Sequence, residues 1–407
     1  MIPRERDGAR MKQKNPYNKT LKACYIGFMT QSITANFAPL LFVTFQKSYG
    51  IPLAQIATIS GTYFFTQLIV DIICSKLADR IGYRACAIAS EALAALGLVS
   101  LAILPGLLPD PFTGILISVL MYAVGSGLIE VIGSPMVEAC PFDNKESVQS
   151  MLHSVYCWGS AGVILLSTLF FTLFGADKWR WLSCAWAVLP LVNIFNFAVC
   201  PIRKLVSDGE GMGIRKLFRT PAFLLGILLM VCAGASELAM AQWASAFAEA
   251  ALGLSKTAGN LAGPFLFAIS MGISRTAYGK FGDRIKLTSF MIWSGFFCLA
   301  SYILAALSRN PVLSLAGCVF CGFAVGIMWP GTISILSRNV PKGGTAMFAF
   351  LAMAGDMGGT VGPEVVGIVS DLRNGSLQAG LLAGAVFPAV LIIGVLAFRR
   401  RAEKMKS

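Results

Sequence analysis

Residues 75–84 read SKLADRIGYR, and residues 279–286 read GKFGDRIK. Both segments have a small residue followed four positions later by Asp-Arg-Ile, and their offset of 204 residues is half of the 407-residue chain. One such match could be a coincidence, but chance is a poor explanation for its recurrence at the same place in both halves. The sequence therefore predicts an internal repeat. Repeated halves are typical of membrane transporters in which two helix bundles move about a central site.

Long apolar stretches surround both copies of this segment. Hydrophobic residues make up 56% of the chain and charged residues 13%, whereas a soluble domain carries about 25% charged residues. A helix needs about 20 mostly apolar residues to cross a bilayer, and backbone groups in lipid must pair internally. The composition therefore argues against a soluble enzyme and predicts an all-α membrane protein with twelve transmembrane helices in two pseudo-repeated six-helix bundles. The expected spans cover residues 20–46, 54–74, 83–104, 112–136, 147–174, 179–199, 219–248, 255–280, 286–307, 311–336, 344–370 and 376–398.

The distribution of Lys and Arg predicts the orientation of these spans. With the N-terminus in the cytoplasm, 27 of the 33 basic residues lie in cytoplasmic segments and 6 lie outside. Cytoplasmic loops carry such an excess, so we expect a multi-pass protein of the cell membrane with both termini in the cytoplasm. The net charge of +13 is then a consequence of topology, and no nucleic-acid partner is expected.

The longest polar connection falls at the midpoint of the chain and predicts a linker between two halves. We expect a cytoplasmic N-terminal tail at 1–19, an N-terminal bundle at 20–200, a cytoplasmic linker at 201–218, a C-terminal bundle at 219–398 and a basic cytoplasmic tail at 399–407.

The repeated segment resembles the signature loop of the major facilitator superfamily, whose pattern is small-x-x-x-Asp-Arg-x-Gly-x-basic. Twelve spans and a degenerate second copy after span 8 fit the same family. The family usually has Gly at the first position, and Ser75 is small enough to allow helices 2 and 11 to approach closely. The resemblance implies a gate at the cytoplasmic face. Asp71 lies one turn before Ser75, and the offset of 204 residues makes Arg275 its counterpart, which suggests a role of both charges in this gate. The predicted gate residues are Asp71, Ser75, Asp79, Arg80, Gly82, Arg84, Arg275, Gly279, Asp283 and Arg284.

Three further spans resemble the fucose-permease-like branch of sugar:proton symporters. Span 4 has Gly-Ser-Gly at 125–127 followed by Glu130, span 5 has His153 and Tyr156, and span 7 has Glu237 with Trp243 six residues later. Those permeases tend to carry an acidic residue in span 1, where this chain has Gln31 and Asn36. The resemblance and the polar or aromatic character of the spans predict a substrate site formed by Gln31, Asn36, Glu130, Tyr156, Glu237, Gln242, Trp243 and Trp329.

Ionisable residues inside apolar spans are costly and commonly functional. Glu130 has no basic residue within two turns, and a buried carboxyl without a cation binds a proton near neutral pH. Glu130 is therefore the first candidate for proton coupling, and Glu237, Asp356 and His153 are the others. For each of them, a hydrogen bond that holds two helices together is the alternative interpretation. Glu91 is expected to be structural and to pair with a loop cation.

The chain shows no pattern for an enzyme, a metal or a cofactor. It contains one histidine, and its CxxC at 318–321 lies on an apolar helix without a second pair. No phosphate-binding loop is present, so ATP is not expected to drive the protein by itself. We expect a monomeric secondary active transporter that works by alternating access and takes up a small polar solute such as a sugar together with protons.

Two alternative functions remain open at this point. A drug or metabolite:proton antiporter is disfavoured because span 4 lacks Arg and span 5 lacks Pro. A non-transporting membrane sensor on the same fold would differ only in a flux assay.

Overall fold

The computed structural model describes residues 15–206, 211–245, 248, 253 and 256–404. Most of the predicted N-terminal tail (1–14), the centre of the predicted linker (207–210), parts of the predicted junction between spans 7 and 8, and residues 405–407 lie outside the described residues. Helices and their connections make up the described chain, which contains no strand.

The first half of the chain supplies seven α-helices. They are α1 (Asn18–Leu40), α2 (Phe42–Tyr49), α3 (Leu53–Ile81), α4 (Tyr83–Leu107), α5 (Pro111–Ala139), α6 (Lys145–Phe174) and, after the short 3₁₀ helix η1 (Ala176–Lys178), α7 (Trp179–Val199). The second half begins after the short α8 (Ile214–Leu217). It contains α9 (Pro221–Ala241), α11 (Lys256–Phe281), the 3₁₀ helix η2 (Gly282–Arg284), α12 (Leu287–Leu307), α13 (Pro311–Val325), α14 (Met328–Asn339), α15 (Gly344–Leu372), α16 (Leu377–Gly384) and α17 (Val386–Lys404).

All-helical architecture is confirmed, whereas the count of twelve spans is confirmed in part. Among the described residues, nine segments are long and apolar enough to cross a membrane, and the bent pair α1–α2 makes a tenth. The other two predicted spans, 255–280 and 344–370, correspond to α11 and α15. These helices are 26 and 29 residues long and pack against such segments.

Proline explains why spans 1 and 10 are not single straight helices. Pro39 lies at the end of α1, and α2 continues at an angle of 46°. In span 10, Pro330 has no N–H to donate to the carbonyl of Gly326, and its ring crowds that carbonyl. The helix therefore breaks between Val325 and Met328, and the Gly326 carbonyl becomes available to another partner.

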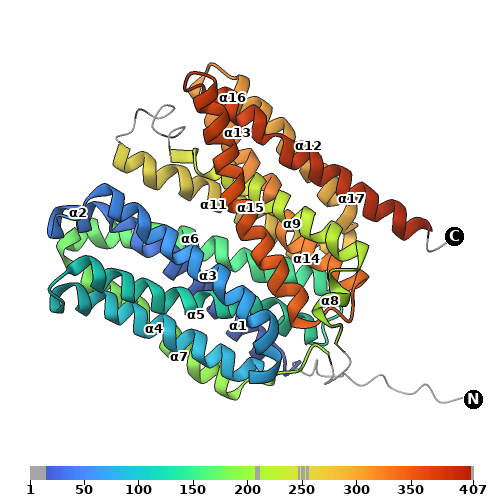
Figure 1. Ribbon diagram of the computed structural model, residues 1–407, viewed down its shortest axis with the longest axis horizontal. Coiled ribbons are helices and arrows are strands. Elements are labelled where there is room, and N and C mark those ends of the chain that lie inside the picture. Colours follow the sequence, from blue (N-terminus) through green and yellow to red (C-terminus); the bar gives the residue numbers. More distant parts are fainter. Residues whose placement is uncertain (1–14, 207–210, 246–247, 249–252, 254–255, 405–407) are drawn as a thin grey trace, which may run out of the picture.

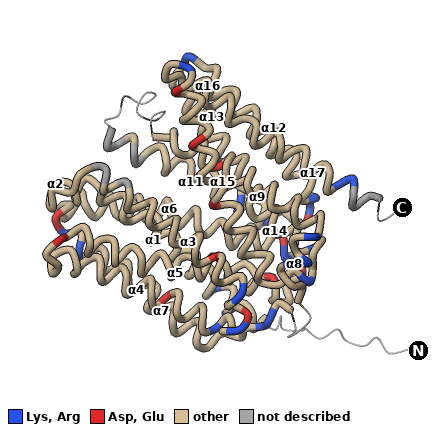
Figure 2. Tube along the Cα trace, in the orientation of Figure 1, with Lys and Arg blue, Asp and Glu red and all other residues tan. Residues whose placement is uncertain are grey.

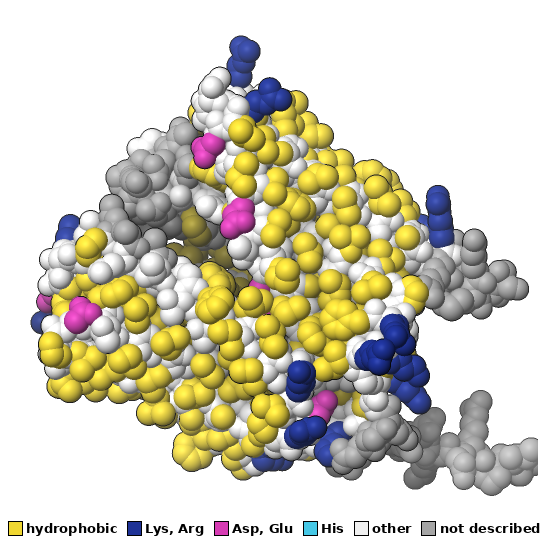
Figure 3. Space-filling model, viewed as in Figure 1, with side chains coloured by type: hydrophobic (Ala, Val, Ile, Leu, Met, Phe, Trp, Pro, Cys, Tyr) yellow, Lys and Arg dark blue, Asp and Glu magenta, His cyan; other side chains and the backbone are white. Residues whose placement is uncertain are grey.

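Two groups of helices face each other in Figure 1. Helices α1–α7 lie in the lower part of the view and α9–α17 in the upper part, and the groups meet where α6 packs against α11 and α3 against α15. Two buried apolar clusters are formed almost entirely by the first group, and the third is formed almost entirely by the second. Large apolar side chains are exposed along the outer flanks, as Figure 3 shows and as a lipid-facing surface requires.

Basic residues gather at one end of the molecule, which we call the basic end. It carries the α3–α4, α5–α6, α7–α9, α11–α12 and α14–α15 connections, and the start of α1 and the end of α17 lie there too. Figure 2 shows the concentration of Lys and Arg around α8 and α14 at this end. We call the opposite end the open end, because Figure 3 shows the surface hollowed between the two groups of helices away from the basic end.

Hydrogen bonds between the two groups of helices are confined to the basic end and mid-depth among the described residues. At the basic end, Thr345 donates to Asp79 at 2.5 Å, and Arg338 pairs with Glu146 at 2.6 Å. At mid-depth, Trp158 Nε1 donates to Thr276 Oγ1 at 2.9 Å. The helices are thus held together at the basic end.

The orientation can be tested by thiol labelling of intact cells. With Cys184, the one exposed native cysteine, replaced by Ser, a Cys introduced at Asp177 should react with a membrane-impermeant maleimide from outside. A Cys introduced at Lys216 should react only after permeabilisation, because basic loops stay in the cytoplasm. Labelling of the Lys216→Cys variant in intact cells would contradict this topology.

Candidate functional site

A cavity of about 130 Å³ lies between the two groups of helices, and both contribute to its walls. Its lining combines aromatic rings with two amides, three carboxyls, one imidazole and one guanidinium. The lining residues are Phe28, Gln31, Tyr63, Phe64, Gln67, Glu130, His153, Tyr156, Gly234, Glu237, Leu238, Arg275, Trp329, Gly355 and Asp356. A concave site with a few convergent polar groups is suited to binding a small molecule.

Glu130 is held in this cavity by two carboxamides. Its Oε2 accepts hydrogen bonds from Gln31 Nε2 on α1 and from Gln67 Nε2 on α3, each at 2.8 Å. Gln67 also donates to Ser126 Oγ at 3.3 Å. The glycines of span 4 permit this arrangement, since a Cβ at Gly127 would lie 3.0 Å from the Val70 side chain of α3. The described residues place no cation in salt-bridge contact with Glu130.

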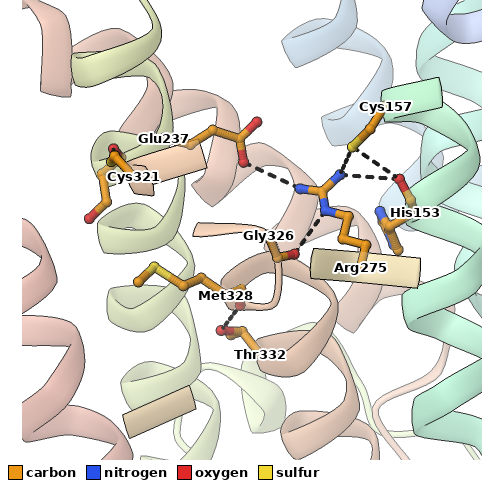
Figure 4. A network of polar contacts seen from close by, with 9 residues as sticks. His153, Cys157, Glu237, Arg275, Cys321, Gly326, Met328 and Thr332 are labelled. Atoms are coloured by element: carbon orange, nitrogen blue, oxygen red, sulfur yellow. Dashed lines mark hydrogen bonds and ion pairs between the residues drawn. The ribbon is translucent and has the colours of Figure 1, made fainter. Parts of the chain in front are cut away.

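Arg275 is the centre of a second polar network, drawn in Figure 4. Its Nε donates to the Gly326 carbonyl at 2.8 Å, the acceptor that Pro330 leaves unpaired. Its Nη1 reaches the carbonyl of His153 at 3.2 Å and Cys157 Sγ at 3.1 Å, and its Nη2 pairs with Glu237 Oε2 at 3.3 Å. The guanidinium therefore connects α11 with α6, α9 and the break in span 10.

This network changes the interpretation of two predicted residues. Arg275 was expected in the gate as the counterpart of Asp71, but it lines the cavity. Glu237 was expected as a proton carrier or substrate ligand, and the structure gives it a cationic partner, Arg275. The charges of this buried pair balance each other.

Other candidates line the cavity in different ways. His153 Nε2 lies 3.1 Å from Ser134 Oγ, and its ring meets Phe28 edge-on at 5.2 Å. Tyr156 lines the wall on α6, and Asp356 lines it on α15, where Asp356 Oδ2 is buried without a hydrogen-bond partner among the described residues. The indole of Trp329 lies against Gly355, at which a Cβ would collide with the ring.

Three predicted substrate residues do not line the cavity. Asn36 donates to the Ser32 carbonyl at 2.8 Å and to Ser160 Oγ at 3.1 Å. Gln242 is exposed just beyond the end of α9, and Trp243 packs against the apolar cluster of the second half.

Glu91 has a different partner from the loop cation that we expected. It accepts hydrogen bonds from Thr30 at 3.0 Å and from Asn193 at 2.8 Å, and it is fully buried within the first group of helices.

Sequence reasoning missed Gln67, Tyr63 and the position of Arg275. The available signal for Gln67 was an amide inside an apolar span, one turn before Asp71. The Tyr63 hydroxyl lies 2.5 Å from Ser126 Oγ and 3.4 Å from Thr34 Oγ1, and only the fold brings these three helices together.

The first copy of the repeated segment connects the two groups of helices. Asp79 accepts from Thr345 on α15, and the Tyr83 hydroxyl lies 2.5 Å from the same Thr345 oxygen. Gly82, with φ of +91°, lets α4 begin directly after α3. Arg84 donates to three carbonyls at the end of α7, at Phe197, Ala198 and Cys200.

The second copy, in the second half of the chain, makes an equivalent connection to the first half. Asp283 accepts a hydrogen bond from Asn144, just before α6. At Gly279, a Cβ would meet the Met151 side chain at 3.0 Å, so α11 approaches α6 closely there.

The remaining predicted gate residues take no part in the hydrogen bonds of these two connections. Ser75 donates to the Ile72 carbonyl of its own helix, and Arg80 and Arg284 are exposed at the basic end. Asp71, by contrast, is buried.

The comparisons with known proteins agree with this geometry. The sequence profile described as Major Facilitator Superfamily matches residues 23–363. A crystal structure of the transporter FucP in the outward conformation is similar with a TM-score of 0.80 and 16% identity, covering 94% of this chain and 99% of that one. A variant of the E. coli fucose:proton symporter FucP is similar with a TM-score of 0.76 and 16% identity, and the match covers the same shares of both chains.

A third similar structure is the proton:xylose symporter XylE bound to 6-bromo-6-deoxy-D-glucose. Its TM-score is 0.78 at 10% identity, and the match covers 92% of this chain and 94% of that one. No curated protein sequence matches the chain. At these identities, the solved structures show a shared fold.

The Asp79–Thr345 contact can be tested by accessibility. In a Cys184→Ser background, a Cys introduced at Ala349, which is buried against the first group of helices, reports opening of the basic end. Asp79→Ala removes a hydrogen bond worth about 1 kcal/mol, so labelling at position 349 should rise about fivefold. Asp177→Ala, at the open end, is the matched control and should leave the rate unchanged. Equal labelling rates in the Asp79→Ala variant and the parent would show that this contact does not hold the gate.

Proposed function

The chain belongs to the major facilitator superfamily, a family of multi-pass membrane transporters, and we propose that it takes up a small polar solute, such as a sugar, in symport with a proton. The observation that carries this proposal is the pairing of Glu130 with Gln31 and Gln67 inside the cavity. FucP and XylE, described as fucose:proton and proton:xylose symporters, share the fold.

Two carboxamides suit a carboxyl that changes its protonation state. Each carboxamide has an N–H donor for the carboxylate and a carbonyl acceptor for the protonated acid, so rotation of the amide satisfies both forms. A Lys or Arg in the same place would favour only the carboxylate. Gln31 lies in span 1, where the resembled branch tends to carry an acid, so Glu130 has no acidic partner there and is our choice for the coupling proton.

The cavity supports a small hydrogen-bonding solute. Its volume of about 130 Å³ is below the roughly 300–1,000 Å³ typical of sites for drug-sized ligands, which disfavours the drug antiporter. Its walls present amides, the Tyr156 hydroxyl and the Arg275–Glu237 pair to hydroxyl groups. Trp329 adds a flat apolar surface on which a sugar ring can pack.

We further propose that the basic end faces the cytoplasm, with both termini there and the cell membrane as the location. The cavity is then closed toward the cytoplasm in this state. Alternating access would follow from motion of bundles 20–200 and 219–398 about the linker 201–218, in a monomer. The partners are the solute, protons and the lipid bilayer.

Glu130→Gln tests this function directly. A thermal-stability screen of purified protein against L-fucose, D-xylose, D-glucose and other sugars identifies the ligand, because a ligand at 100 times its Kd stabilises by about 2.7 kcal/mol. In proteoliposomes, the Glu130→Gln variant should exchange that sugar across the membrane but lose accumulation driven by a pH gradient. The amide mimics the protonated carboxyl and releases no proton.

The controls separate Glu130 from its rivals. Glu138→Gln lies on the same helix, outside the cavity lining, and should accumulate the sugar normally. Glu237→Gln and Asp356→Asn are assayed in parallel. Concentrative uptake with unchanged pH dependence in the Glu130→Gln variant would refute the role of Glu130. An exchange-only result in one rival would transfer the role to that residue, and absence of sugar flux in the unmodified protein would favour a sensor.

A further inference from the structure

Asp71 is a buried carboxyl that the transport site described above does not use. It lies on α3, one turn from Gln67 toward the basic end, and is 1% exposed. Neither of its carboxyl oxygens has a hydrogen-bond partner among the described residues. A charge buried in this way is strongly destabilised unless it is paired or hydrogen-bonded. An ionised Asp71 would therefore have no compensating partner among the described residues in this state.

The groups around Asp71 are acids from both bundles. Helix α3 packs against α5 and α15, and α15 packs against α5. The groups that act electrostatically on Asp71 are Glu130 from α5 and Asp356 from α15, and Asp71 in turn acts on the Cys74 thiol of its own helix. Its counterpart in the repeat, Arg275, is bonded to Glu237. Among the described residues, no Lys, Arg or His forms a salt bridge with Asp71.

Two of these three carboxyls line the cavity. Glu130 and Asp356 line the cavity, and Asp71 does not. Beyond Asp71, α3 continues two turns to Asp79, whose hydrogen bond to Thr345 holds α3 against α15. Separation of α3 from α15 at this contact would open the basic end, which is the end of α3 toward which Asp71 lies.

We propose that Asp71 is a second proton-binding site, which exchanges its proton with water only through the basic end. The inference rests on the proposed function in taking the proton as the coupling ion. When α3 and α15 part, the O–H bond of Asp71 breaks, the proton passes to water, and the carboxylate is hydrated. Closing the basic end again requires a proton on Asp71.

This site makes closure of the basic end dependent on pH. The closed state binds one more proton at Asp71 than the open state, so low pH favours closure and rising pH favours opening. In the pH range in which Asp71 is ionised in the open state and protonated in the closed state, the ratio of open to closed molecules rises up to tenfold per pH unit.

Hydrogen exchange of the purified full-length protein without solute tests the proposal. Exchange of the amides of residues 75–81 and 344–352 is measured by mass spectrometry between pH 6 and 9 and corrected for the intrinsic chemical rate. In the unmodified protein, the corrected rates should rise by up to tenfold per pH unit over part of this range. Asp71→Asn should abolish that rise, and Asp71→Glu should retain it. Asp371→Asn, an exposed carboxyl at the far end of α15, is the control and should behave like the parent.

The variants at neighbouring acids decide between the possible sources of a pH response. Loss of the response in Asp71→Asn with its retention in Glu130→Gln, Asp356→Asn and Cys74→Ser supports the proposal. An unchanged response in Asp71→Asn, or a flat profile in the parent, overturns it. If Asp71→Asn does not fold, Asp71→Leu removes the titratable group at similar volume and is read in the same way. The proposed function is judged separately, by sugar accumulation in the Glu130→Gln variant.

Discussion

A charged group inside a lipid-embedded helix bundle needs a partner of opposite charge, hydrogen-bond donors or a proton, and this requirement organises the centre of the molecule. Glu237 has Arg275 as its partner, and Glu91 has Thr30 and Asn193 as donors. Glu130 has two carboxamides, whereas Asp71 has no hydrogen-bond partner in the part of the chain that the structure describes. The first two groups have fixed partners, so the exchangeable protons are expected at the other two.

Close helix contacts bring these groups together. Gly234 and Gly355 touch on α9 and α15, so that a Cβ at Gly234 would collide with the Gly355 carbonyl. Trp329 occupies the space that Gly355 leaves beside the cavity. Pro330 contributes in another way, because the carbonyl that it leaves unpaired at Gly326 is the acceptor that fixes the Arg275 guanidinium. Backbone geometry thus positions the cation that balances Glu237.

The sequence predicted the helical class and most of the spans, because apolar length is a local property of the chain. It also placed Glu130 in the cavity wall. It could not predict that Gln67 joins Gln31 on the same carboxylate oxygen, since this depends on how α1, α3 and α5 cross. Arg275 was misplaced because its offset from Asp71 suggested a shared role. The break at Pro330 and the neighbouring Glu237 give it a different one, and Gln242 and Trp243 fall just beyond the end of α9.

Symport requires that solute and proton bind to the same state of the protein, and we propose that the proton binds at Glu130. Linkage requires that a solute which favours the protonated form also draws protons onto the protein. The most direct measurement is the pH change when the identified sugar is added to purified protein in weak buffer. The starting pH is the midpoint of the range over which the affinity for the sugar changes with pH. We expect proton uptake by the unmodified protein and none by the Glu130→Gln variant. Proton release on sugar binding, or equal uptake by both proteins, would contradict it.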